Sequence, residues 1–123
     1  MNTYFVTAAA LCAVTTYIHC YFGGRHIAEP LLRASDIHDV PKYTNYFCWH
    51  LVSAMLAVMS LSFLWAAIAP EAKEAAIIAE MLAVVFMVWG IGLIVWKRQS
   101  FRQMPQWILF GSISLAGGAG LLT

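Results

Sequence analysis

Charge is the property that this sequence has least of. Its 123 residues include seven Lys or Arg and six Asp or Glu, so that 11% are charged, whereas soluble globular domains have about 25%. So few charged side chains cannot cover the surface of a water-soluble domain of this size. Seven basic residues are also too few for a nucleic-acid-binding surface. The composition therefore excludes an ordinary soluble enzyme and a nucleic-acid binder.

Cysteine is scarce as well. The three cysteines are Cys12, Cys20 and Cys48, which lie in or beside apolar stretches. An odd number in such positions favours buried free thiols over a disulfide framework. Lys and Arg are absent before residue 25, so the basic region of a cleaved signal peptide is missing. We therefore expect the first apolar stretch to remain as a membrane helix.

Long uncharged segments are abundant. Asp, Glu, Lys and Arg are absent from residues 1–24, 43–70, 81–96 and 103–123. A helix of about 20 mostly apolar residues spans the hydrocarbon core of a bilayer, and its backbone groups bond to one another there. The sequence thus predicts an all-α fold and one integral-membrane domain over residues 1–123. This domain is a four-helix transmembrane bundle of up-and-down topology, with spans at about 4–22, 43–69, 75–96 and 104–122.

Glycine and proline predict where the spans begin and end. Gly23 and Gly24 are expected to end the first helix, because glycine favours the C-terminal cap. The second helix is expected to start at Asp39, with Pro41 in its first turn. Pro70 should end the second span, and Pro105 should lie in the first turn of the fourth. Residues 23–42 and 97–103 are then loops on the same side of the membrane.

The basic residues predict the orientation. Six of the seven lie in these two loops: Arg25, Arg33, Lys42, Lys97, Arg98 and Arg102. The opposite side has only Lys73. Because Lys and Arg are concentrated in cytoplasmic loops, we expect both loops to be cytoplasmic and both termini to be on the non-cytoplasmic side. The predicted location is an inner or plasma membrane.

All four histidines lie in or beside the segment that joins the first two spans. His19 and His50 are expected at similar depths on neighbouring helices, with Cys20 and Cys48 beside them. Such residues can bind haem iron or a transition metal such as zinc or copper, although no spacing matches a metal-binding motif. The alternative is that the two histidines hydrogen-bond across helices or to lipid head groups.

The 23–42 loop is polar and long. Its candidate binding residues are Arg25, His26, Arg33, His38 and Lys42. They could hold a phosphate, an anionic lipid head group or a partner subunit, and part of the loop could form a helix on the membrane surface. The alternative is a solvated loop with local Arg33–Glu29 and Lys42–Asp39 pairs.

Glu80 is the only carboxylate inside a predicted span. An ionisable residue within a membrane is a candidate for proton or cation transport. The alternative is that Glu80 belongs to an outer extension of its helix and faces water or a polar neighbour.

The last span has small residues at a spacing of four. They are Ser112, Ser114, Ala116, Gly118 and Gly120. Such faces allow helices to approach closely. The face could pack inside the four-helix monomer, or against a second copy or a partner protein.

These features favour a non-enzymatic function, because no catalytic motif is present and the predicted loops are too short to form a domain outside the membrane. We expect an accessory or assembly subunit of a larger membrane complex, or a homo-oligomer, surrounded by membrane lipids. One alternative is a redox protein with haem or a metal at His19 and His50. Others are a small transporter or channel that uses Glu80, and an enzyme acting on lipid or quinone.

Overall fold

The structure is a computed structural model that describes residues 1–123, and all its regular elements are helical. In chain order they are α1 (Thr3–Tyr17), η1 (Ile18–Ala28), α2 (Glu29–Arg33), α3 (Asp39–Ile68), η2 (Pro70–Ala72), α4 (Lys73–Trp96) and α5 (Gln106–Leu122). The predicted all-α class is therefore confirmed.

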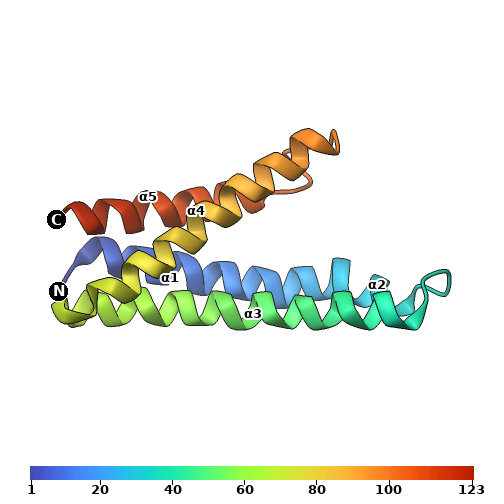
Figure 1. The fold of residues 1–123 in the computed structure, drawn as a ribbon, viewed down its shortest axis with the longest axis horizontal. Helices are drawn as coiled ribbons and strands as arrows, with labels where there is room; N and C mark the ends of the chain where they lie inside the picture. The colour runs from blue at the N-terminus through green and yellow to red at the C-terminus, as the bar shows by residue number, and fades with distance from the viewer.

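The helices run up and down along one long axis. The continuous helix formed by α1, η1 and α2 lies beside α3, while α5 packs against α1 and α4 (Figure 1). Both chain ends and η2 lie at one end of the molecule, which we call the terminal end. From there α4 crosses the bundle diagonally and finishes away from α3 at the opposite end (Figure 1), which we call the open end.

The first helix is longer than the sequence predicts. The chain continues from α1 through η1, an 11-residue π-helix, and then through α2 to Arg33. The prediction that Gly23 and Gly24 end this helix is wrong, and most of the predicted 23–42 loop is helical. Only residues 34–38 separate α2 from α3. Neither glycine adopts the positive φ of a helix-ending cap, so the backbone passes through both in helical form.

The other predicted boundaries agree with the structure to within a few residues. α3 begins at Asp39 as expected, although His38 occupies the N-cap position. It ends at Ile68, just before Pro70, and Pro105 immediately precedes α5. α4 and α5 end at Trp96 and Leu122, where the predicted third and fourth spans end.

Three helical segments are long and apolar enough to cross a membrane. They are Thr3–Arg33, Asp39–Ile68 and Pro70–Trp96. The fourth, α5, is apolar but has only 17 residues, which is near the lower limit of about 17 for a spanning helix.

Small side chains form much of the core. Seven buried alanines come from α1, α3 and α4, namely Ala8, Ala9, Ala66, Ala67, Ala76, Ala79 and Ala83. Larger side chains, led by Leu56, Met59 and Phe63 of α3, fill the remaining space. Small residues at helix contacts bring backbones close together. The buried alanines therefore allow α1, α3 and α4 to pack closely together.

The core thins towards the open end. In α4 the buried residues are Ala76, Ala79 and Ala83 in the first half, followed only by Ile94. This pattern agrees with the path of α4 in Figure 1, where its second half diverges from α1 and α3.

Candidate functional site

Each of the two predicted histidines contacts an aromatic ring. The Nε2 atom of His19 lies 3.3 Å from the backbone oxygen of Trp49, and the two rings stack with their centroids 3.9 Å apart. His50 is exposed and packs edge-on against Tyr46, with centroids 4.6 Å apart. His19 therefore makes a hydrogen bond across helices, which is one of the two interpretations of this residue.

One nitrogen of His19 is already used by a hydrogen bond. A carbonyl oxygen can only accept a hydrogen bond, so Nε2 of His19 carries the proton that it donates to Trp49. That nitrogen is therefore engaged, whereas Nδ1 of His19 makes no hydrogen bond. Cys20 and Cys48 are exposed free thiols. No group of three or more His, Cys, Asp or Glu side chains is arranged to hold a metal ion.

Trp49 is positioned by Gly23. A Cβ atom at Gly23 would lie 2.6 Å from Cη2 and 3.0 Å from Cζ2 of the indole. Gly23 thus leaves room for Trp49, the largest side chain at the contact between η1 and α3.

A pocket of about 450 Å³ lies beside this contact, between η1, α3 and the start of α5. We call it the open-end pocket. Its lining includes the apolar Phe22, Trp49, Val52, Leu56 and Phe110, and the polar Thr15, His19, His26, Gln103 and Gln106. None of its lining residues comes from α4. The size is within the range of about 300–1,000 Å³ that is typical of small-molecule sites.

Glu80 lies between α4 and α5. Its carboxyl group contacts Gly117 and approaches Gly118. Its carboxyl group lies within reach of the Ser114 hydroxyl, although the buried Oε2 atom and the Ser114 oxygen make no hydrogen bond of normal geometry. Glu80 is seven residues beyond Lys73, or about 10 Å along the helix. The structure therefore places this carboxylate against another helix, inside the bundle.

The polar residues of the predicted first loop form the tip of the helix pair at the open end. Both local ion pairs expected there are present. Arg33 pairs with Glu29, and Nζ of Lys42 lies 4.0 Å from Asp39 Oδ1. Lys42 is buried, whereas the remaining candidates, Arg25, Arg33, His26 and His38, are exposed. Arg25 lies over the ring of Tyr21, 5.9 Å from its centroid.

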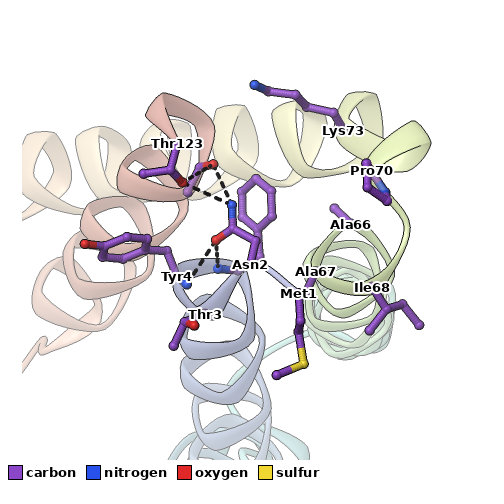
Figure 2. Close-up of a pocket in the computed structure, with 12 residues that line it drawn as sticks. Met1, Asn2, Thr3, Tyr4, Ala66, Ala67, Ile68, Pro70, Lys73 and Thr123 are labelled. Carbon is purple, nitrogen blue, oxygen red and sulfur yellow. Dashed lines mark hydrogen bonds between the residues drawn. The ribbon is translucent and has the colours of Figure 1, made fainter.

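A second pocket, of about 510 Å³, lies at the terminal end (Figure 2). Asn2 joins the helix ends around it. Its Oδ1 accepts hydrogen bonds from two N–H groups in the first turn of α1, and its Nδ2 donates to Gly120 O at 2.9 Å. The backbone N–H of Asn2 donates to Ala67 O at 2.9 Å, and Lys73 Nζ donates to Leu121 O at 3.1 Å. These bonds satisfy groups at helix ends and give the pocket a structural role.

The small residues of α5 contact other helices of the same chain. Gly120 is buried, and a Cβ atom there would lie 2.5 Å from the ring of Phe5. Ser112, Ser114, Ala116 and Gly118 are half-buried. Leu115, between these small residues, faces outward and is 79% exposed. The small-residue face is thus used inside the monomer, between α1 and α4.

Several important residues were not identified from the sequence. Gly117 and Gly23 make close helix contacts, and Gln106 has a buried Oε1 without a partner beside the open-end pocket. Trp49 is a large aromatic residue next to His50, and this position could have marked it as a candidate contact of the histidines. Its pairing with Gly23, however, depends on how the two helices meet, and no local signal encodes this.

No family model, curated protein or solved structure matches the chain. The fold and composition define an all-helical protein with three helices that are long and apolar enough to span a membrane.

Proposed function

We propose that the chain is a small multi-pass membrane protein that crosses the bilayer four times and acts as a non-enzymatic subunit. In this proposal it belongs to a larger membrane complex or forms a homo-oligomer. The exposed apolar surface supports a membrane location. Leu61, Trp65 and Ile68 of α3 are 57–66% exposed, and Met81, Val88 and Trp89 of α4 are 59–69% exposed. Soluble monomers rarely expose a continuous apolar surface of this kind.

The charges support the proposed orientation. The six basic residues of the predicted cytoplasmic side all lie near the open end, away from both termini. The end of α4 carries an interfacial pair, since Lys97 Nζ lies over the Trp96 ring, 4.0 Å from its centroid. Interfacial tryptophans and basic loops are typical of the cytoplasmic ends of spans. This distribution supports termini on the non-cytoplasmic side.

The second half of α4 is the feature that supports a protein partner. It diverges from α1 and α3, and its Trp89 side chain is 69% exposed. Gly92 is exposed, and an added Cβ there would meet no atom within 4 Å. Within membranes, an open glycine beside a large ring favours close approach of another helix. We therefore place the subunit contact at Trp89 and Gly92.

Replacement of Gly92 by leucine tests this contact. Because nothing within the chain lies near Gly92, Gly92→Leu should leave the fold intact and block an approaching helix. We expect native mass spectrometry of gently extracted membranes to show wild-type chain in a complex and the variant largely as monomer. Ala57→Leu, at an exposed position of α3, is the matched control and should remain in the complex. A wild-type chain that is monomeric and binds no other protein would contradict the proposal.

A second candidate function is proton or cation transport through Glu80. The buried Oε2 atom favours it, because a carboxylate inside a bilayer is costly and marks candidate proton or cation sites.

Flux through proteoliposomes tests the role of Glu80. If Glu80 carries the transported ion, the wild-type protein should give a pH-dependent flux and Glu80→Gln should abolish it. Glu74→Gln is the control, since Glu74 is exposed on the same helix. A flux that is equal in wild type and Glu80→Gln would remove Glu80 from the mechanism.

A further inference from the structure

The open-end pocket has the shape and lining of a site for a small apolar molecule. Its walls are formed by η1, α3 and the start of α5, with Thr15 of α1. Three aromatic side chains from these three elements line it, namely Phe22, Trp49 and Phe110. Aromatic side chains favour offset or edge-to-face contacts with another planar ring. The lining is thus suited to a ring-shaped ligand.

Three side chains that line the pocket have an atom that can accept a hydrogen bond. His19 uses Nε2 to donate to Trp49 O, so in the neutral ring Nδ1 is left as an acceptor. No hydrogen bond to Nδ1 is present in the structure. Gln106 has a buried Oε1 without a partner. The Thr15 hydroxyl donates its proton to Leu11 O at 2.8 Å, so it too can only accept from a ligand.

We propose that the open-end pocket binds a lipid-soluble phenol or quinol, a planar ring with a hydroxyl donor and an apolar tail. The hydroxyl group donates to His19 Nδ1 or Gln106 Oε1, and the ring packs among the aromatic side chains. A buried acceptor without a donor costs free energy, so a hydroxyl ligand relieves this cost, whereas a carbonyl ligand can pair only with donors such as the side-chain amide of Gln103. The inference rests on the proposed membrane location, because the ligand enters from the lipid.

The two redox forms of one probe separate this proposal from simple apolar binding. Decylubiquinol carries hydroxyl donors, whereas decylubiquinone has the same ring and tail but only acceptors at those positions. The full chain in lipid nanodiscs is titrated with each form, the reduced one without oxygen, and saturable quenching of tryptophan fluorescence is followed. We expect the reduced form to bind at least about fivefold more tightly. In the complex with the oxidised form, a carbonyl oxygen of the probe would face an acceptor atom of the pocket, and neither atom could donate a hydrogen bond.

Three variants locate the binding. Val52→Phe fills the pocket and should abolish saturable quenching, while Val88→Phe, on the exposed face of α4, should leave it unchanged. His19→Phe keeps a ring to stack on Trp49 but removes Nδ1. We expect it to weaken binding of the reduced form about three- to tenfold and to reduce the preference for that form. If Val52→Phe fails to fold, Gln106→Met, which removes the buried amide oxygen, should also weaken binding of the reduced form.

Several results would overturn the inference. They are the absence of saturable binding, an equal or stronger affinity for the oxidised form, and equal binding by the wild type and by Val52→Phe or Gln106→Met. Failure of the proposed membrane location would be seen earlier, because the chain would not enter nanodiscs. A protein that enters nanodiscs and binds neither form therefore contradicts the ligand site alone.

Discussion

Single glycines determine how closely the helices of this protein approach one another. Gly117 is the clearest case, because α5 meets both the Glu80 carboxyl group and the Phe63 ring there. An added Cβ would lie 2.9 Å from two ring atoms of Phe63 and would also collide with Glu80 Oε2. Gly23 serves Trp49 in the same way. At the residue scale, large side chains of one helix pack directly against glycines of a neighbouring helix.

Gly117→Ala should therefore destabilise the protein. Overpacking a close contact costs about 1–3 kcal/mol, which we expect as a lower midpoint in denaturation from a mild detergent by SDS. Gly92→Ala is the control, since its new methyl group meets nothing within 4 Å. It should be neutral, or stabilising by up to about 1 kcal/mol through helix propensity. Equal midpoints for the two variants would show that the Gly117 contact is unimportant.

The candidate sites were predictable from residue type but not from their contacts. Glu80 stands out because it is the only carboxylate in a predicted span, and His19 and His50 because they lie near span ends. Contacts depend instead on the rotation of each helix about its axis. The nearly uniform apolar composition of the spans hides this rotation, so the pairing of His19 with Trp49 was not foreseen.

At the scale of the elements, the positions of the helices were largely predictable. Long uncharged runs gave four helices, and proline correctly indicated the end of α3 and the start of α5. Gly23 and Gly24 misled because glycine is common both at helix ends and at close contacts within membranes. The helical backbone at both glycines, and the packing of Trp49 against Gly23, distinguish the two roles.

Hydrogen exchange can test the continuous first helix. In η1 and α2 the backbone N–H groups are bonded within the helix, so we expect amides from Gly24 to Arg33 to exchange slowly in detergent. Residues 34–38 provide an internal reference, because they form no helix and should exchange fast. If residues 24–33 exchanged as fast as this reference, they would form a loop, and the continuous first helix would be contradicted.

At the scale of the whole molecule, the two ends differ. The terminal end is closed by hydrogen bonds between helix ends and by alanine packing, as seen around Asn2 in Figure 2. The open end has the diverging half of α4, the open-end pocket and most of the charged residues. The proposed subunit contact and the proposed ligand site both lie towards the open end. We therefore expect variants at that end to change binding and variants at the terminal end to change stability.

The central claim is that the chain spans a membrane with its terminal end outside and its open end in the cytoplasm. The most direct measurement labels single cysteines with a membrane-impermeant maleimide, in a variant with Cys12→Ala, Cys20→Ser and Cys48→Ser. In intact spheroplasts we predict that Thr123→Cys is labelled and that Ser100→Cys, in the segment between α4 and α5, is labelled only after lysis. Labelling of Ser100→Cys but not Thr123→Cys in intact spheroplasts, equal labelling of both, or recovery of the chain in the soluble fraction would contradict the account.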